Sequence, residues 1–272
     1  MARTLPAYKA YLSCAGYSEY TPDDFTADVR LLSQFLVGKR LEDIETSDLQ
    51  QWIGQLKQTM PPKTVSRKVS ALGNYFRWLT AERVLARNPA EHIRAERVTS
   101  PLPRPLYDSE CERLLTTASR DPRTYLLVLL VLESGLKKAE LLELRMSDFD
   151  FSNQYQPEVW VRHSGRQVYK DRRLKLPPHI KPVFDDYVQR FGVSDVLFPY
   201  TPQWVAELLR GAARQAGIVK PVSASILRDM FVVRSVRRGM RLEDVLKKIG
   251  LSGNSSYDDA LKKYIRLTGE AL

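Results

Sequence analysis

The feature that most constrains this chain is an unbroken apolar run followed by an interruption of the helical pattern. Residues 125–132 are all apolar, a length that suits a buried core helix and falls well short of a membrane span. Ser134-Gly135 interrupts the pattern, and apolar residues at helical spacing resume over 136–144. Such a break places one side chain at a helix N-terminus, beside backbone N–H groups that favour a phosphate. That side chain is Lys137.

The charge of the chain indicates a polyanionic partner. Its 272 residues, 43% of them hydrophobic, can bury a substantial core. The net charge of +10 attracts a polyanion such as nucleic acid. A basic protein without such a partner is the alternative interpretation.

Cysteine usage and hydropathy argue against several other classes. Cys14 and Cys111 lie far apart and belong to no CxxC motif, so we predict no disulfide and no zinc site. We also expect no other metal and no cofactor. No apolar N-terminal leader and no segment of membrane-spanning length is present. We therefore expect a cytoplasmic protein without a membrane partner, associated with the nucleoid if it binds DNA.

Periodicity and proline content divide the chain. Residues 1–94 read as an all-α unit, residues 95–105 as an extended linker rich in proline, and residues 106–272 as a second domain. Further helices of the second domain are expected at 179–191, 202–216 and 223–239. Before these helices the period becomes alternating at 158–162 and 173–177, which predicts a β-hairpin around a polar turn.

One helix of the first unit, over residues 63–80, combines an apolar stripe with charged opposite surfaces. Its basic side chains are Lys63, Arg67, Lys68 and Arg77. They form either a solvated face or a phosphate-binding surface, and the same two interpretations apply to Arg234 in the second domain.

Several motifs resemble the tyrosine recombinase (phage integrase) family, including its Xer-type members. Residues 135–144, Gly-Leu-Lys-Lys-Ala-Glu-Leu-Leu-Glu-Leu, match that family's Gly-Leu-Arg-x-x-Glu-Leu-x-x-Leu, with Lys137 in place of the first catalytic arginine. Residues 222–229 resemble its Ser-Pro-His-x-Leu-Arg-His box. Arg228 falls on the second catalytic arginine, while Ser225 and Asp229 replace the two histidines.

Two further segments extend the resemblance toward each end of the chain. Residues 242–251 are similar to a segment that ends Leu-Gly-His, with Leu251 at the histidine. Tyr264 then stands where the nucleophilic tyrosine is expected, and Tyr257 is its rival. Residues 64–72, which include Ser66, resemble the core-binding helix that lies along the DNA backbone.

The resemblance implies a mainly α, two-domain architecture: a helical core-binding (SAM-like) domain and an α-rich catalytic-type domain with a β-hairpin. It implies a C-shaped clamp on duplex DNA, with self-assembly or a partner recombinase there. In the implied reaction the tyrosine attacks a DNA phosphate without a metal, two arginines clamp the phosphate and a hairpin lysine protonates the leaving oxygen. Lys170 is the expected lysine. Arg166 is its neighbour in the same turn and a candidate DNA contact.

The departures at Lys137, Ser225, Asp229 and Leu251 lead to two hypotheses. Lysine lacks the planar fork of arginine, and serine does not titrate near neutral pH. The first hypothesis is a DNA-binding family member with impaired or absent cleavage, acting as an architectural, regulatory or accessory factor. The second is a divergent active recombinase that uses Tyr264, Arg228, Lys137 and Lys170. A scaffold that makes only protein contacts is a third, disfavoured by the charge.

Three side chains have structural alternatives that the sequence leaves open. Arg228 is either a phosphate ligand or part of an interior ion pair with a carboxylate such as Glu140. Tyr264 is either a nucleophile or a packed tyrosine. His163, on the hairpin, is the one histidine expected to approach the site.

Overall fold

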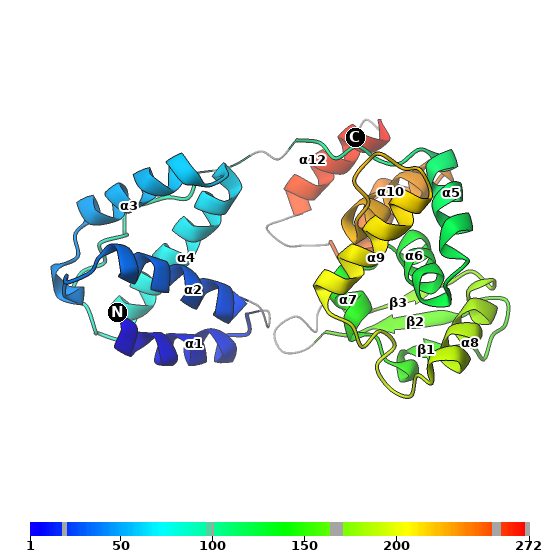
Figure 1. Cartoon of the computed structure of the whole chain (residues 1–272), viewed down its shortest axis with the longest axis horizontal. Coiled ribbons are helices and arrows are strands. Elements are labelled where there is room, and N and C mark those ends of the chain that lie inside the picture. The colour runs from blue at the N-terminus through cyan, green and yellow to red at the C-terminus, as the bar shows by residue number, and fades with distance from the viewer. Residues whose placement is uncertain (18–20, 97, 99–100, 164–170, 252–256, 270–272) are drawn as a thin grey trace. The chain divides into compact units, whose positions relative to one another are not determined.

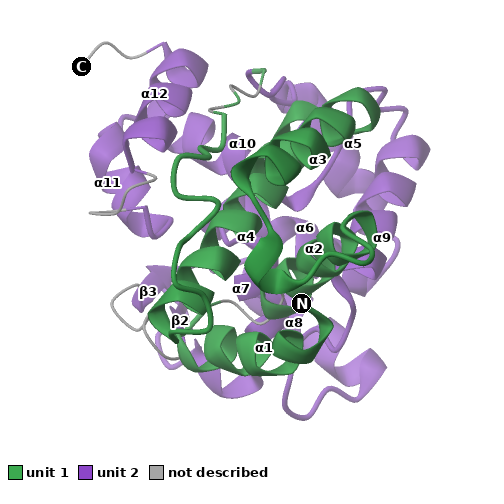
Figure 2. Cartoon of the chain, turned by 90° about the vertical axis from the view of Figure 1, so that its left-hand side faces the viewer, with its two compact units in different colours: residues 1–101 green, residues 102–272 purple. Residues whose placement is uncertain are grey.

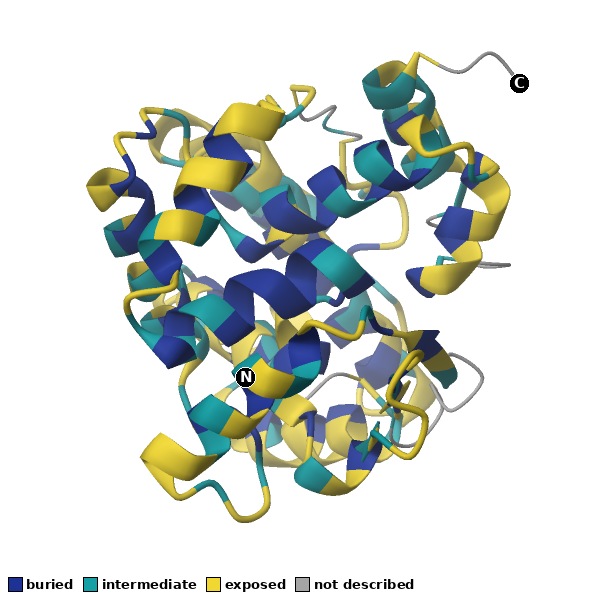
Figure 3. Ribbon diagram, turned by 90° about the vertical axis from the view of Figure 1, so that its right-hand side faces the viewer, coloured by how far each residue is buried: buried dark blue, intermediate teal, exposed yellow. Residues whose placement is uncertain are grey.

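The computed structural model describes residues 1–17, 21–96, 98, 101–163, 171–251 and 257–269 (Figure 1). It forms two compact units, Met1–Pro101 and Leu102–Leu272, coloured separately in Figure 2. Each unit encloses a hydrophobic core of its own. Most helices are buried along one side and exposed along the other, as Figure 3 shows. Across the described ranges, no helix is both long enough and apolar enough to span a membrane.

Helices are the only regular secondary structure in the described part of the first unit. Its elements are η1 (Ala2–Thr4), α1 (Leu5–Cys14), α2 (Thr21–Phe35), η2 (Leu41–Asp43), α3 (Thr46–Thr59) and α4 (Pro62–Ala81). Helix α4 begins at Pro62, whose missing N–H costs nothing in the first turn. The predicted stripe is buried along α4, and Tyr75 and Phe76 lie in the centre of the core.

A buried ion cluster joins α2 to α4. Asp28 accepts hydrogen bonds from Arg67 at 2.7 and 3.1 Å and from Lys68 at 2.6 Å. The side chains of Asp28 and Lys68 are 3% and 6% exposed. The structure therefore corrects the expectation that Lys68 lies on a charged surface: a buried carboxylate needs a cation, and Lys68 supplies it.

The second unit surrounds one apolar helix. Its elements are α5 (Asp108–Ala118), α6 (Pro122–Ser134), α7 (Lys138–Glu143), η3 (Met146–Asp148), β1 (Phe149–Asp150), β2 (Glu158–Val161), β3 (Arg172–Lys175), α8 (Ile180–Phe191), α9 (Pro202–Gln215), α10 (Ala224–Arg237), α11 (Leu242–Lys248) and α12 (Tyr257–Thr268). Residues 126–132 of α6 are all buried, and α5, α8, α9 and α10 pack around it. The Asp121 side chain caps its N-terminus by accepting from the Thr124 N–H.

Gly135 ends α6 in a left-handed conformation with φ of 66°. A Cβ at this position would lie 2.5 Å from Phe231 and 2.7 Å from Ile249. Both the backbone conformation and the close approach of two side chains thus require glycine. Two residues after this turn the chain reaches Lys137, which is the N-cap of α7.

The strands form an antiparallel sheet in the order β1-β2-β3. The two predicted strands pair with Val159 opposite Leu174, and β1 is a third strand that the sequence did not suggest. Val159 and Leu174 face the core. Because side chains alternate along a strand, Arg172 lies on the same face as Leu174, and Arg173 lies on the other.

Helices α10, α11 and α12 share a separate hydrophobic cluster, which we call the C-terminal cluster. Its buried members are Val232, Leu242, Val245, Leu246, Ile249 and Tyr264. Leu251 and Tyr257 are partly buried against it.

Candidate active site

Three of the residues singled out in the sequence line one pocket of about 310 Å³ in the second unit: Lys137, Ser225 and Arg228. Lys137 comes from the N-terminus of α7, and the other two come from the first turns of α10. The Ser223 hydroxyl starts α10 by accepting from the Ile226 N–H. Lys138 and Ser223 also line the pocket, and cations together with hydroxyls provide the chemistry needed to hold a phosphate oxygen.

Glu140 is the carboxylate that lies closest to both Lys137 and Arg228, and its side chain is 3% exposed. It accepts the Lys137 backbone N–H at 2.8 Å, and the Lys137 Nζ lies 3.7 Å from its other oxygen. Arg172 donates to both carboxylate oxygens, at 3.1 and 2.9 Å, and His163 Nε2 lies 3.3 Å away. Burial would raise the pKa of Glu140, but the hydrogen bonds from His163 and Arg172 outweigh it and hold that pKa well below its ordinary value.

Arg228 is buried, and two backbone carbonyls hold its guanidinium. One Nη donates to the Gly135 carbonyl, and the other donates to the Ile249 carbonyl at 2.7 Å. Glu140 lies 3.8 Å away. Burial lowers the pKa of Arg228, and the charge of Glu140 opposes that effect. The ion pair considered from the sequence is therefore present, but it is longer than the bonds to the carbonyls.

Tyr264 is 3% exposed and lies in the C-terminal cluster. Its hydroxyl donates to Asp229 Oδ1 at 2.9 Å, and Lys263 Nζ donates to the same oxygen at 2.6 Å. Burial and the charge of Asp229 both raise the pKa of Tyr264. Among the described residues, those lining the 310 Å³ pocket do not include Tyr264.

Two predicted residues, Lys170 and Arg166, lie outside the described residues.

Sequence reasoning missed Arg172, which holds Glu140, although the sequence contained one signal for it. A basic residue at the inward-facing parity of a strand, two positions before the buried Leu174, indicates a buried partner. Within the described ranges, no group of His, Cys, Asp and Glu is arranged to hold a metal.

The predicted DNA contacts have different degrees of exposure. Lys63 and Arg77 are exposed on α4, and the Arg67 side chain is 42% exposed while paired with Asp28. Ser66 is partly buried and donates to the Glu96 carbonyl at 2.9 Å. Arg234 pairs with Asp108 at 3.0 Å, and its side chain is 16% exposed.

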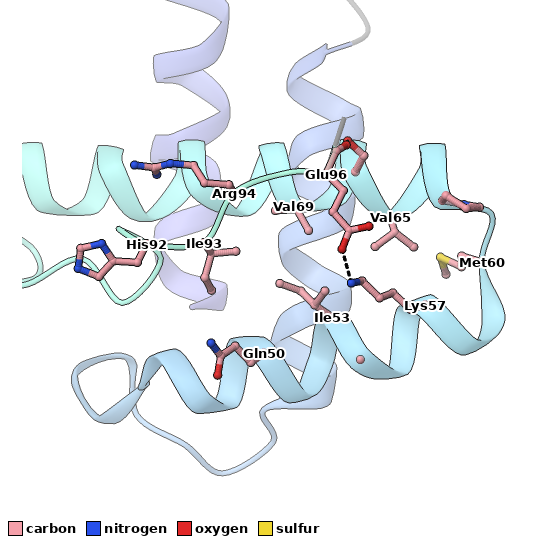
Figure 4. A pocket seen from close by; sticks show the side chains of 13 residues that line it. Gln50, Ile53, Lys57, Met60, Val65, Val69, His92, Ile93, Arg94 and Glu96 are labelled. Atoms are coloured by element: carbon pink, nitrogen blue, oxygen red, sulfur yellow. Dashed lines mark hydrogen bonds and ion pairs between the residues drawn. The ribbon is translucent and has the colours of Figure 1, made fainter. Parts of the chain in front are cut away.

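Ser66 also borders a pocket of about 520 Å³ in the first unit. Helices α3 and α4 and the segment at 92–96 line this pocket, and Figure 4 shows an ion pair between Lys57 and Glu96 at its edge. The pocket thus combines apolar walls with a polar rim.

Comparison with known families identifies the architecture. Residues 104–266 match the phage integrase family, and residues 5–83 match the phage integrase N-terminal SAM-like domain. The chain belongs to the phage integrase, or tyrosine recombinase, family. The predicted fold class, mainly α with the two-domain tyrosine recombinase architecture, is confirmed.

Relatives of this tyrosine recombinase family member align along nearly the whole chain. A tyrosine recombinase of Pseudothermotoga lettingae is 27% identical, covering 94% of this chain and 93% of its own. Tyrosine recombinase XerC of Anoxybacillus flavithermus is 25% identical, covering 97% and 95%.

Solved structures of the family share the fold at low identity. A lambda integrase dimer bound to a COC′ core site has a TM-score of 0.75 and 16% identity, covering 100% of this chain and 79% of that one. XerH site-specific recombinase bound to difH substrate has a TM-score of 0.69 and 17% identity, covering 97% and 80%.

Proposed function

We propose that this tyrosine recombinase family member binds duplex DNA but cleaves it poorly or not at all. It would act as an architectural, regulatory or accessory factor in recombination, together with a partner recombinase or further copies of itself on DNA. The observation that carries the proposal is that the buried Tyr264 hydroxyl donates its proton to Asp229, and that Tyr264 is absent from the described lining of the pocket that holds Lys137, Ser225 and Arg228. Binding to DNA would place the protein in the cytoplasm, at the nucleoid.

Three observations support DNA binding. The net charge of +10 gives long-range attraction to a polyanion. Lys63 and Arg77 are exposed on α4, in the part of the chain that resembles the core-binding helix. Lambda integrase and XerH, which share the fold, were solved on DNA core-site and difH substrates.

The chemistry of the site supports impaired cleavage. Lys137 supplies charge without the bidentate fork of arginine, and Ser225 cannot exchange a proton near neutral pH. Asp229 keeps the Tyr264 proton in place, which opposes formation of the nucleophile. Loss of one preorganised donor in an enzyme costs about 10²–10³ in rate, so several losses together suppress turnover.

The alternative is an active, divergent recombinase, and the convergence of Lys137 and Arg228 on one pocket favours it. In that reaction the Tyr264 hydroxyl would give its proton to Asp229, and its oxygen would bond to a DNA phosphorus as the bond to the 5′ oxygen breaks. Lys170 would protonate the departing 5′ oxygen, leaving a 3′-phosphotyrosyl bond and a free 5′-hydroxyl.

DNA binding is tested by fluorescence anisotropy of a labelled duplex at several salt concentrations. We expect binding that weakens linearly in log Kd against log salt, because lysine and arginine contacts release counterions. Absence of binding at low salt would favour the third hypothesis, a scaffold for protein contacts.

Cleavage is tested with a nicked suicide duplex that traps a covalent protein–DNA adduct. We expect little or no adduct from the wild type. Rapid adduct formation that disappears in Tyr264→Phe would overturn the proposal of impaired cleavage and establish the active alternative. The Tyr257→Phe variant distinguishes the two tyrosines.

A further inference from the structure

More cationic side chains lie near the buried carboxylate of Glu140 than form hydrogen bonds with it. Arg172 holds both of its oxygens, at 3.1 and 2.9 Å. Lys137 Nζ and Arg228 Nη1 remain at 3.7 and 3.8 Å, beyond hydrogen-bond length. These two more distant cations line the pocket, while Arg172 does not appear in its lining.

Arg172 is itself fixed in place from two sides. Its Nε donates to the Lys248 carbonyl at 2.6 Å, and its side chain is 11% exposed. Gly250 leaves room for it, because a Cβ there would lie 3.1 Å from Arg172 Nη1. The guanidinium is therefore a preset partner for Glu140 that needs no rearrangement when a ligand arrives.

Without Arg172, the charge of Glu140 would have to be neutralised by another group. A buried, unpaired carboxylate is costly. His163 lies 3.3 Å from Glu140, and the lysine and arginine side chains next nearest to it are those of Lys137 and Arg228, which line the pocket. A shift of about 1 Å would bring either side chain within hydrogen-bond length of Glu140. Each such move takes positive charge away from the pocket.

We propose that Arg172 is a positioning residue: by neutralising Glu140 it keeps the charges of Lys137 and Arg228 directed at a DNA phosphate in the pocket. This inference rests on the proposed DNA binding and is independent of whether cleavage occurs. Arg172 acts through Glu140 and does not touch the phosphate.

The neighbouring Arg173 offers a matched control on the same strand. Its side chain is 62% exposed, lies 3.8 Å from Glu158 and stacks over Trp160 with 5.0 Å to the ring centroid. Arg172→Gln and Arg173→Gln remove the same charge one position apart, on opposite faces of β3.

The experiment measures the slope of log Kd against log salt for a fluorescent duplex. For Arg172→Gln we expect a slope smaller in magnitude than that of the wild type by about 1 to 2, as one or two phosphate contacts are lost. Arg173→Gln should keep the wild-type slope. Adding Glu140→Gln to Arg172→Gln should restore it, because no carboxylate then competes for the pocket cations.

Several outcomes would overturn the inference. An unchanged slope in Arg172→Gln, an equal loss in Arg173→Gln, or no restoration in the double variant would each do so. If Arg172→Gln does not fold, Glu140→Gln is compared with Glu140→Gln/Arg172→Gln, and a difference between their slopes contradicts the role. Absence of DNA binding by the wild type overturns the proposed function and this inference together.

Discussion

The hydroxyl of Tyr264 donates a 2.9 Å hydrogen bond to Asp229, and both side chains are buried. The sequence motif predicts that Asp229 replaces the second histidine of the family, and in the structure the side chain at this position bonds to the tyrosine. Lys263 bonds the same carboxylate oxygen, and the other oxygen of Asp229 has no hydrogen-bond partner in the part of the chain that is described. This contact joins α10 to α12 and keeps the hydroxyl protonated.

Alkaline stability tests that contact. The pKa of Tyr264 is raised in the folded state above its unfolded value of about 10, so the resulting stability is complete below about pH 10 and declines as pH rises above it. We expect the free energy of unfolding to fall more steeply above pH 10 in the wild type than in Tyr264→Phe. Urea denaturation at pH 8 and at higher pH measures the difference. Parallel pH dependence in the two proteins would contradict the buried hydrogen bond.

Glu140→Gln should destabilise the second unit strongly. Removing this carboxylate leaves Arg172 and Arg228 without a buried counter-charge, and we expect a loss of about 3 kcal/mol at pH 7. The folded pKa of Glu140 is depressed, so its stabilising effect is present above the unfolded pKa of about 4.3 and is lost as pH falls below it. Urea denaturation should therefore find a smaller difference at pH 3 than at pH 7. A constant difference at both pH values would argue against the ionised carboxylate.

Gly135→Ala should separate a steric requirement from a conformational one. The left-handed backbone and the clash with Phe231 and Ile249 together predict a loss of about 3 kcal/mol. Gly192 is the matched control: it ends α8 with φ of 59°, and a Cβ added there would meet no described atom within 4 Å. Its alanine variant should lose about 1 kcal/mol, the cost of the left-handed backbone alone. Thermal unfolding of both variants makes the comparison, and equal losses would contradict close packing at Gly135.

In the first unit, Asp28→Ala should be severe. It leaves Lys68 buried without its carboxylate, and we expect a loss of about 3–5 kcal/mol, measured by chemical denaturation. Asp43→Ala removes an exposed pair with Arg40 and should leave stability unchanged within error. If Asp28→Ala behaved like Asp43→Ala, the Asp28 cluster would have no structural role.

Cleavage should respond to restoration of the family residues. We expect Lys137→Arg combined with Ser225→His to raise the rate of covalent trapping on a suicide duplex by at least about 100-fold over the wild type. The Tyr264→Phe version of the same double variant is the control and should trap nothing. No gain in the double variant would indicate that Tyr264 and Asp229, rather than the pocket, limit the reaction.

Much of the fold could be predicted because it follows from local patterns. The apolar run at 125–132 became the central helix α6, and the alternating segments became β2 and β3. The third strand, β1, was missed because a two-residue strand carries no periodicity. Ser225 and Arg228 follow the Ser223 cap on α10, so a short motif was enough to put them on one helix turn.

What the sequence determined by itself is therefore the family, the order of the main helices and of strands β2 and β3, and three of the residues that line the pocket in the second unit. The tertiary structure alone decided which charge meets which. Lys68 is buried on Asp28, Arg172 holds Glu140, and Tyr264 is bonded to Asp229. Periodicity specifies which face of a helix or strand is buried, but the partner on the opposing element depends on how distant segments pack.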